Sequence, residues 1–400
     1  MKILVLCREL PLPLTSGEKI RCYHILKGLA REHDVTLVSL VLHKSDLTYI
    51  NELKKFCQSV YTFEINFSKK LSALKTAFSS LPWDVLAYQN NEAKLKISEL
   101  NQSQKFDIIW INFLSMSGYV NRKDLNKTIL ILDQHNADEL VWANYIRNST
   151  NPVMKTFAWL NRGKVKSFQR KIFKDINVIV CVSKEDAEYI KPQVPAGVST
   201  WIIPNGVDTE YFVPVNTNRK VNAVMLCASM DVTMNIDAAL QFAKIFPNIK
   251  QKIPDAEFWI VGRNPPKQIV ALNQEGYIKV TGSVIDVRPY YNEARVIVAP
   301  YRFGGGTKLK ILEAIAMNLP IVSTTVGCQG IDTTGMSNII IRDDINQFSE
   351  AVIDILLGNT DIIRQKVHDS SKILEERYSW TSITRKIDFK LTELFKMTLE

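Results

Sequence analysis

The stretch ARVIVAPYRFGGGTKLKILEAIAMNLPIVST (294–324) predicts a strand, a glycine turn, a helix and a second strand in succession. The first strand is an apolar run that ends at Pro300, and the helix is expected to begin near Thr307. The apolar positions of this helix are Leu309, Ile311, Leu312, Ile315 and Ala316. Because a helix that joins two strands makes them parallel, the stretch indicates a parallel α/β sheet.

Similar apolar runs alternate with helical patterns along the chain. In the first half they lie at 2–7, 35–42, 107–113, 128–133 and 178–183. In the second half they lie at 222–229, 256–262, 277–282, 294–300 and 319–324. Continuous apolar strands separated by helices are typical of a sheet covered on both faces. Because the series restarts, we expect two doubly wound α/β domains that bind ligands at the carboxyl ends of their strands.

The length of 400 residues also exceeds what one hydrophobic core usually organises. Turn-forming and polar residues gather between Pro204 and Asn218, so we expect domains at 1–204 and 205–380. Ser379 is a candidate N-cap for a final helix, and we assign this helix, 381–400, to the first domain, to which it would cross back.

The composition is that of a globular protein, with 46% apolar and 23% charged residues. There is no apolar run of 18 residues, and the start MKILVLC indicates a first strand, not a signal peptide. The six cysteines are scattered among apolar runs, which favours reduced core thiols in a cytoplasmic protein. The net charge of +9 favours anionic partners: a nucleotide sugar, nucleic acid or a membrane surface.

The glycine turn Gly304–Gly306 is the first candidate binding element. Glycines let a backbone approach a ligand, and a helix N-terminus attracts phosphate. Lys308 and Lys310 place cations in the first turn of the helix, where they oppose its dipole. A bound anion such as pyrophosphate would remove that conflict. The alternative is a turn with two solvated lysines.

Glu313 is the second candidate. It lies on an otherwise apolar helix face, so its carboxylate needs donors, which a ribose diol would provide. The alternative is a partner for Lys310. The segment matches neither GxGxxG nor the P-loop pattern, so those nucleotide-binding schemes are not supported.

Several motifs together resemble family-four glycosyltransferases of the GT-B fold, of the type that builds bacterial envelope or exopolysaccharide. They are FGGGTKLKILEAIAMNLPIVST (303–324), VSKED (182–186), IPNGVD (203–208), FWIVGRNPP (258–266) and TGSVIDVRPYYNEA (281–294). The resemblance implies two Rossmann-like domains facing a cleft, and hexosyl transfer with retention. It places the nucleotide sugar on the C-terminal domain and the acceptor on the N-terminal one. It requires no metal or other cofactor, because lysines, arginines and helix N-termini hold the pyrophosphate.

Carried over to this chain, the resemblance implies roles for individual residues of the C-terminal half. Lys308 and Lys310 would stabilise the diphosphate charge, and Glu313 would bind the ribose hydroxyls. The other donor-binding residues would be Arg263, Ser283, Val284, Gly304, Gly305, Gly306 and Thr307. Arg263 would lie against the base, although an exposed arginine after a strand is the plain alternative.

The N-terminal half resembles the family in its first loop and after one buried strand. Gly17 would let the backbone approach the donor phosphate or the acceptor, and Arg21 would lie on the acceptor side. His135 in LDQHNAD (132–138) would project toward the donor sugar and take part in catalysis. An ordinary strand-to-helix turn and a satisfied loop histidine are the alternatives.

Two positions depart from the family pattern. Gly305 stands where many members have a second glutamate, so that carboxylate is missing from sugar recognition. The segment ASMDVTMNIDA (228–238) lacks the basic residue that many members carry, and Lys308 and Lys310 would replace it. We expect Asn235 to cap the helix that follows.

These features predict transfer of a sugar from a nucleotide diphosphate, expected to be a UDP-sugar. The acceptor would be a saccharide, free or linked to polyprenyl. With the retention that the resemblance implies, the leaving phosphate would itself take the acceptor proton, which agrees with a site that is rich in phosphate binders and has no obvious nucleophile. A sugar-nucleotide epimerase and a non-catalytic sugar-nucleotide-binding partner remain alternatives. Nucleic-acid binding is not expected, because the basic residues match no known module.

Two basic stretches, 66–83 and 159–175, predict amphipathic helices. Lysines and arginines near an anionic surface attract it, so a peripheral position on the inner face of the membrane is one reading. Solvated helix faces are the other.

Overall fold

The computed structural model describes residues 1–399 except 67, 123, 124, 126, 150, 216–221, 274–276 and 359. Part of the expected domain boundary, residues 216–218, therefore lies outside the described residues. The chain forms two compact units. Unit 1 comprises Met1–Pro204 and Ile383–Glu400, and unit 2 comprises Asn205–Ser382.

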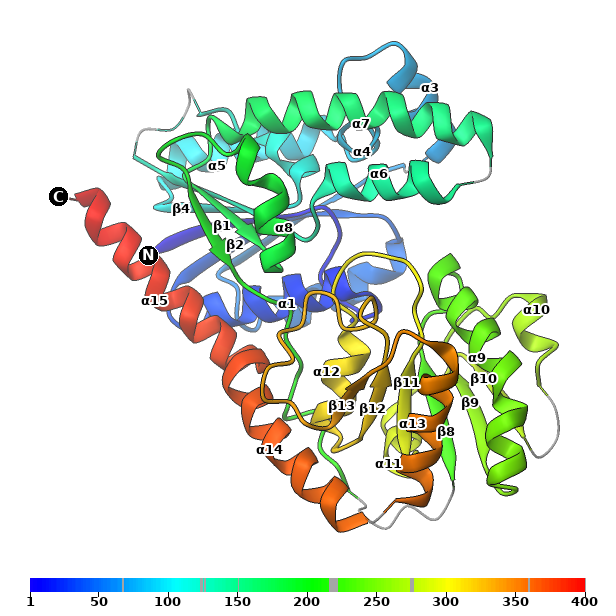
Figure 1. Ribbon diagram of the computed structural model, residues 1–400. Helices are drawn as coiled ribbons and strands as arrows, with labels where there is room; N and C mark the ends of the chain where they lie inside the picture. Colours follow the sequence, from blue (N-terminus) through cyan, green and yellow to red (C-terminus); the bar gives the residue numbers. More distant parts are fainter. Residues whose placement is uncertain are drawn as a thin grey trace. The chain divides into compact units, whose positions relative to one another are not determined.

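Unit 1 is built on a parallel sheet with the strand order β3-β2-β1-β4-β5-β6-β7 (Figure 1). Its strands are β1 (Lys2–Cys7), β2 (Asp34–Val41), β3 (Ser59–Glu64), β4 (Ile108–Asn112), β5 (Ile129–Gln134), β6 (Val178–Cys181) and β7 (Ser199–Ile202). Leu4 and Leu6 share a core with Ile97 and Val165 of two covering helices. Ile3 and Val5 alternate to the other face and are also buried, so both faces are covered.

The helices of unit 1 connect these strands. They are α1 (Gly17–Leu29), α2 (Ile50–Leu53), α3 (Lys69–Ala77), α4 (Trp83–Ala87), α5 (Asn91–Gln104), α6 (Asp138–Asn148), α7 (Pro152–Phe173) and α8 (Lys184–Ile190). Short 3-10 turns lie at Lys44–Tyr49, Leu114–Tyr119 and Lys191–Gln193. Side-chain caps fix several helix starts: Ser16 accepts from the Lys19 amide, and Asn90 accepts from the Ala93 amide.

Unit 2 contains a second parallel sheet with the order β10-β9-β8-β11-β12-β13. Its strands are β8 (Ala223–Cys227), β9 (Glu257–Val261), β10 (Ile278–Gly282), β11 (Val296–Ala299), β12 (Ile321–Ser323) and β13 (Ile339–Ile341). Its helices are α9 (Thr233–Lys252), α10 (Lys267–Val270), α11 (Arg288–Glu293), α12 (Leu309–Ala316), α13 (Ile345–Leu357) and α14 (Thr360–Tyr378). The two sheets confirm the expected doubly wound α/β architecture.

Strands β3, β7 and β13 were not predicted from the sequence. Each lies at an edge of its sheet, where one side has no neighbouring strand. The residues of β3 and β7 are mixed in polarity and mostly half-buried or exposed, so these strands lack the continuous apolar run of a central strand. Strand β13 is apolar, but its three isoleucines form a run too short to identify a strand.

The last helix, α15 (Trp380–Leu399), begins in unit 2 and continues into unit 1. The Ser379 hydroxyl accepts from the Ser382 amide at 3.1 Å, which confirms Ser379 as the cap. Within unit 1, Ile387 and Leu391 are fully buried, and the Lys390 ammonium lies 5.3 Å from the Trp201 ring.

Candidate active site

The glycine turn of unit 2 follows β11 and leads into α12. Gly304 and Gly306 have φ angles of 114° and 75°, a region that side chains disfavour. A Cβ on Gly304 would lie 2.2 Å from the Met234 sulfur, whereas one on Gly305 would meet open space. Two of the three glycines are therefore required by the conformation of the turn.

Lys308 is the N-cap residue of α12, so the helix begins two residues later than expected. Its ammonium folds back on the turn and donates to the carbonyls of Gly305 and Gly306, at 3.1 and 2.9 Å. Burial lowers the pKa of Lys308 to about 8. An ammonium has three donors, so these bonds leave one for a ligand.

Glu313 is buried in α12 and accepts a 2.9 Å hydrogen bond from the Tyr291 hydroxyl. Burial, Cys227 and Glu313 together raise the pKa of Tyr291 well above its usual value. Lys310 is half-buried, and the Glu313 charge raises the pKa of its ammonium. One carboxylate thus interacts with a tyrosine and a lysine at the start of α12.

Thr307 lies at the end of the turn. Among the described residues, its buried hydroxyl oxygen has no hydrogen-bond partner. A buried polar atom without a partner is costly, and a bound ligand would satisfy it.

Other loops at the carboxyl edge of the same sheet hold the remaining candidates. Arg263 is exposed after β9, and its Nε donates to the Ser229 hydroxyl at 2.8 Å. Ser283 is exposed and Val284 half-buried in the loop after β10. The expected cap at Asn235 is wrong: Val232 occupies the N-cap position, and the Asn235 amide donates to the Ser229 carbonyl at 2.7 Å.

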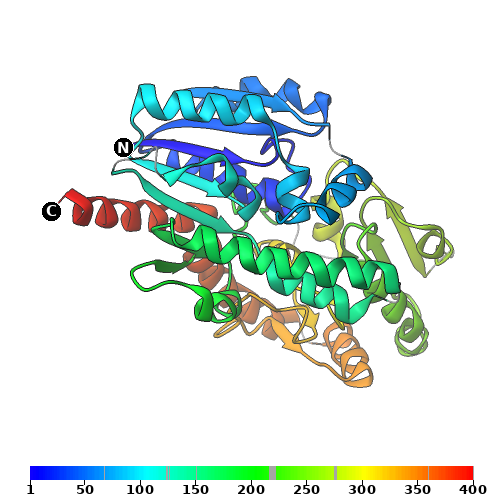
Figure 2. The same cartoon turned by 90° about the horizontal axis from the view of Figure 1, so that it is seen from above.

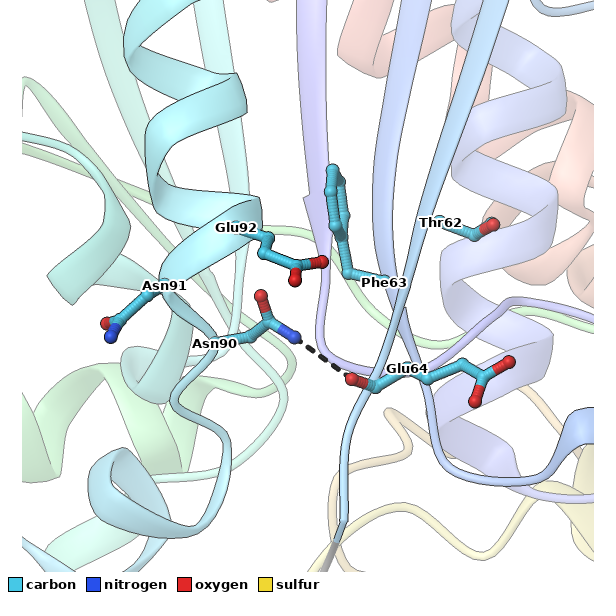
Figure 3. Close-up of a pocket in the computed structure, with 6 residues that line it drawn as sticks. All are labelled: Thr62, Phe63, Glu64, Asn90, Asn91 and Glu92. Atoms are coloured by element: carbon cyan, nitrogen blue, oxygen red, sulfur yellow. Dashed lines mark hydrogen bonds between the residues drawn. The ribbon is translucent and has the colours of Figure 1, made fainter.

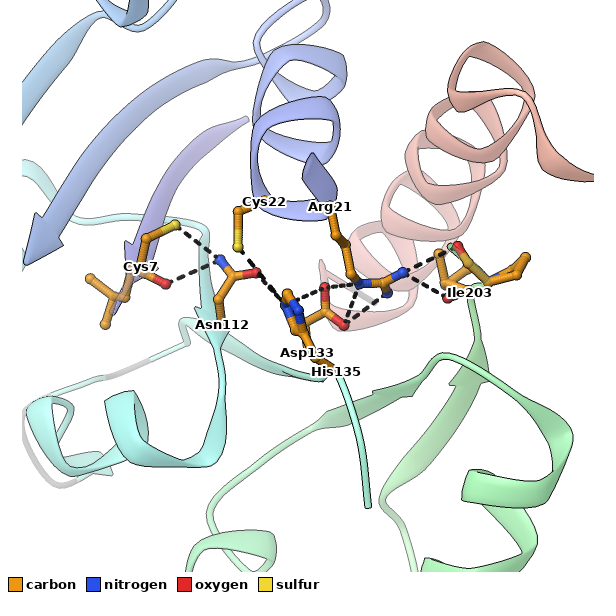
Figure 4. A network of polar contacts seen from close by, with 9 residues as sticks. Cys7, Arg21, Cys22, Asn112, Asp133, His135 and Ile203 are labelled. Atoms are coloured by element: carbon orange, nitrogen blue, oxygen red, sulfur yellow. Dashed lines mark hydrogen bonds and ion pairs between the residues drawn. The ribbon is translucent and has the colours of Figure 1, made fainter. Parts of the chain in front are cut away.

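His135 follows β5 in unit 1 and is buried (Figure 4). Its Nε2 lies 3.4 Å from the Asn112 Oδ1 and 3.9 Å from the Cys22 sulfur. Its ring stacks on Phe113 with a centroid separation of 3.9 Å. Burial, then Arg21 and Arg8, lower the pKa of His135 well below 6.5, so the imidazole is neutral at pH 7.

Arg21 is 1% exposed and serves the interior of unit 1 (Figure 4). Its guanidinium pairs with Asp133 at 2.8 Å and donates to the carbonyls of Ile203 and Pro204. The sequence placed Arg21 on the acceptor side of the site. In the structure its guanidinium instead bonds to groups in the interior of unit 1. Gly17 is the first residue of α1.

Arg8 and Phe113 lie beside His135, but the sequence did not identify them as candidate site residues. The Arg8 guanidinium lies 3.7 Å from the centroid of Phe113 and pairs with Glu18 at 2.6 Å. Phe113 has a φ of 73°, an uncommon conformation for a side chain of this size. Both residues directly follow strands, and the carboxyl ends of such strands form the ligand-binding edge of the sheet. This position in the sequence could have identified both residues as candidates.

Two acidic residues were also missed. Burial raises the pKa of Asp84, at the start of α4. Burial and the Asp84 carboxylate raise the pKa of Asp138, at the start of α6, to about 7. A carboxyl with such a pKa is able to exchange a proton near neutral pH.

A separate pocket lies at the carboxyl end of β3 (Figure 3). It is lined by Thr62, Phe63, Glu64, Asn90, Asn91 and Glu92, none of which was a sequence candidate. The Asn90 amide donates to the Glu64 carbonyl at 2.9 Å. Within the part of the chain that the structure describes, His, Cys, Asp and Glu form no group of three able to hold a metal ion.

Two family models match the chain. Residues 16–211 match the model described as Glycosyltransferase Family 4, and residues 222–357 match the one described as Glycosyl transferases group 1. The chain is a family-4-like glycosyltransferase.

Relatives of this glycosyltransferase include an uncharacterized 44.6 kDa protein in the cps region of Klebsiella pneumoniae. It is 20% identical over 396 residues, which cover 94% of this chain and 96% of that protein. A human protein, one of the subunits of phosphatidylinositol N-acetylglucosaminyltransferase, is 27% identical over 230 residues, covering 54% of this chain and 45% of that protein.

Solved structures share the fold along the whole length of this glycosyltransferase. Sucrose-phosphate synthase from Thermosynechococcus elongatus has a TM-score of 0.69 at 15% identity, covering 99% of this chain and 100% of that one. Anabaena HepE in complex with UDP has a TM-score of 0.65 at 15% identity, covering 98% and 100%. The fold is therefore GT-B.

All six cysteines of this glycosyltransferase are buried free thiols, as expected. No described helix is both long and apolar enough to cross a membrane.

Proposed function

We propose that this glycosyltransferase moves a hexose from a UDP-sugar to a saccharide or polyprenyl-linked saccharide, with retention, in polysaccharide biosynthesis. The observation that carries the proposal is the turn Gly304–Gly306, with its left-handed backbone and the Lys308 ammonium against it. The UDP in the HepE structure and the cps-region relative support the nucleotide and the pathway.

Unit 2 binds the donor in this proposal. The third N–H of Lys308 and the ammonium of Lys310 donate to the diphosphate, and Glu313 accepts from the ribose hydroxyls. Arg263 lies against the base. The remaining donor contacts come from the backbone of Ser283, Val284, Gly304, Gly305, Gly306 and Thr307.

Unit 1 serves the sugar and the acceptor in this proposal. A neutral His135 contacts the transferred sugar by hydrogen bonding. Arg21 is a positioning residue, because it holds Asp133, whose carboxylate lies 4.0 Å from the His135 Nε2. The amide of Gly17, at the N-terminus of α1, remains a proposed contact to the donor phosphate or the acceptor.

The proposed reaction exchanges two bonds at the anomeric carbon. The bond to the diphosphate oxygen breaks, and the acceptor oxygen bonds to the same face of the sugar. The acceptor proton passes to the leaving phosphate, and UDP departs. Lys308 and Lys310 stabilise the charge that develops on that oxygen. No step requires a metal.

Binding of UDP to Lys310→Ala tests the donor site. A charge-assisted hydrogen bond contributes about 1.5–3 kcal/mol, so titration calorimetry should show affinity reduced roughly 10- to 100-fold. Lys252→Ala, an exposed lysine at the end of α9, is the matched control and should bind normally. Equal affinity in both variants would refute the role of Lys310.

Measuring UDP release with and without an acceptor distinguishes a glycosyltransferase from a sugar-nucleotide epimerase. A transferase forms a glycosylated product only with the acceptor present, whereas an epimerase converts the donor without one. A third possibility is that the chain is a non-catalytic sugar-nucleotide-binding partner. It is worth testing because Gly305 provides no carboxylate for sugar recognition. Donor binding without turnover on any saccharide or polyprenyl-linked acceptor would support it.

A further inference from the structure

The polar groups around the His135 ring gather on one face of the unit 1 sheet (Figure 4). Asn112 and Asp133 are paired in the register of β4 and β5, and they are 1% and 0% exposed. Both face α1, because Arg21 and Cys22 of that helix contact Asp133 and His135. Helix α7 covers the opposite face of the sheet (Figures 1 and 2). Polar side chains buried in this way need defined hydrogen-bond partners.

The orientation of the Asn112 amide is fixed by its nitrogen. The Nδ2 atom donates to the Leu6 carbonyl at 3.1 Å and lies 3.4 Å from the Cys7 sulfur. A carbonyl oxygen only accepts hydrogen bonds, so the nitrogen of the amide, and not its oxygen, must face Leu6. The amide oxygen Oδ1 is thereby turned toward His135, whose Nε2 lies 3.4 Å away.

The Asn112 oxygen in turn decides which nitrogen of His135 carries the proton. The imidazole is neutral at pH 7, so it has one N–H donor and one bare acceptor nitrogen. Two oxygens that only accept lie near Nε2: Oδ1 of Asn112, and at 4.0 Å Oδ2 of Asp133, whose carboxylate pairs with Arg21. The Cys22 thiol can donate or accept, so it fits either tautomer. Nε2 therefore carries the proton, and Nδ1 keeps a free lone pair.

The Nδ1 atom of His135 is open to a ligand. It has no hydrogen-bond partner in the described part of the chain, and it is not one of the fully buried polar atoms that lack a partner. The Phe113 ring covers one face of the imidazole, with 3.9 Å between the ring centroids. A flip of the ring that presented Nε2 instead would break the contact with Asn112. An acceptor nitrogen is thus offered at the carboxyl edge of the sheet, where such sheets bind ligands.

We propose that Asn112 is a positioning residue that holds His135 in the Nε2–H tautomer, so that Nδ1 accepts a hydrogen bond from a hydroxyl group of the transferred sugar. A hydroxyl group donates to this lone pair, whereas a carboxylate has no proton to donate and is repelled by it. The site therefore selects a neutral hexose and disfavours a uronic acid. This inference rests on the proposed function, from which it takes the contact between His135 and the sugar.

Nitrogen-15 NMR of the full-length protein with labelled histidine tests the tautomer without any ligand. The chemical shift of each ring nitrogen shows whether it carries a proton, and His135→Gln identifies the signals among the five histidines. At pH 7 the wild-type spectrum should show a protonated Nε2 and a bare Nδ1. Asn112→Leu removes the acceptor, so the ratio of the Nε2–H to the Nδ1–H tautomer should fall roughly 2- to 10-fold. Asn112→Ala serves the same purpose if the leucine variant does not fold.

The matched control for the tautomer is Cys22→Ala. This substitution removes the other side chain in contact with Nε2 and leaves Asn112 in place, so the tautomer ratio should stay as in wild type.

Calorimetry with UDP, UDP-glucose and UDP-glucuronate tests the selectivity for a hydroxyl group. The two sugars differ only in a hydroxymethyl group that a carboxylate replaces. Wild type should bind UDP-glucose roughly 10-fold more tightly than UDP-glucuronate, because the carboxylate leaves the Nδ1 acceptor without a donor. Asn112→Leu should narrow this difference and keep wild-type affinity for UDP, which carries no sugar. Cys22→Ala should keep the wild-type preference.

Three results would overturn the proposal: a protonated Nδ1 in wild type, an unchanged tautomer ratio in both Asn112 variants, or equal affinity of wild type for the two nucleotide sugars. A lower affinity of Asn112→Leu for UDP with an unchanged tautomer ratio would also count against it, since that assigns Asn112 to the structure of unit 1 alone. Failure of wild type to bind UDP at all would contradict the proposed function, and the ligand-free NMR spectra would still decide the role of Asn112.

Discussion

If Lys308 binds the diphosphate as proposed, burial of its ammonium makes donor binding depend on pH in a way that an exposed lysine would not. Below pH 8 the amine is charged in the free protein, and binding of UDP requires no proton. Above about pH 8 the free amine is neutral, and a diphosphate that stabilises the ammonium draws a proton from solution.

Calorimetry at pH 8.5 in buffers of different ionisation enthalpy should therefore report proton uptake on UDP binding, and at pH 7 almost none. The variant Lys308→Arg stays charged and should show no uptake at either pH. Equal proton uptake by both proteins would show that another group titrates.

His135 is a second residue whose burial sets its charge. Its pKa in the folded protein lies well below 6.5, so the unfolded chain binds more protons at acidic pH. The free energy of unfolding should therefore fall as pH decreases below 6.5, and His135→Gln should weaken that dependence. Denaturant titrations between pH 5 and 7 measure the effect, with the exposed His43→Gln as the control.

The proposed contact between His135 and the transferred sugar has a separate kinetic signature. If the neutral imidazole contacts the sugar, His135→Gln lowers kcat more than it lowers affinity for free UDP. An equal loss in UDP affinity would instead place His135 at the diphosphate.

At the scale of elements, the sequence predicted the central strands and the glycine turn because their requirements are local. A strand buried on both faces must be apolar throughout, and a left-handed turn selects glycine. Edge strand β3 escaped prediction because half-buried positions accept mixed sequences, and β13 escaped because its run of three isoleucines is too short to identify a strand. The stack of Arg8, Phe113 and His135 escaped because it joins three distant segments, which no spacing along the chain reveals.

The glycine turn allows the same substitution to be compared at two adjacent residues, Gly304 and Gly305. Gly304→Ala would force a side chain into left-handed backbone and against Met234, at a cost of about 1–2 kcal/mol from the backbone alone. Gly305→Ala meets open space and has no positive φ. Thermal unfolding should show a lower Tm for Gly304→Ala only, and UDP affinity should fall with it. A similar fall in Tm for both variants would show that the positive φ of Gly304 and its contact with Met234 do not explain the loss.

At the scale of the whole molecule, unit 1 is discontinuous in sequence, because Ile383–Glu400 completes it after all of unit 2. Gly28 of α1 lies so close to α15 that an added Cβ would be 2.3 Å from the Thr384 methyl group. Gly28→Ala should therefore lower the Tm of unit 1 by displacing α15. Gly163→Ala in α7 meets no neighbour and should keep or raise the Tm, since alanine favours helix by about 1 kcal/mol. Differential scanning calorimetry compares the two.

The same discontinuity determines the order in which the two units can fold during translation. The segment Met1–Pro204 emerges first but cannot bury the side chains that meet Ile387 and Leu391 until Ile383–Glu400 has been translated. Unit 2 is contiguous and ends at Ser382, so its sequence is complete before the segment that closes unit 1 is synthesised. A chain truncated before Ile383 would thus have a complete unit 2 and an unfinished unit 1, which cellular proteases would recognise by its exposed apolar surface.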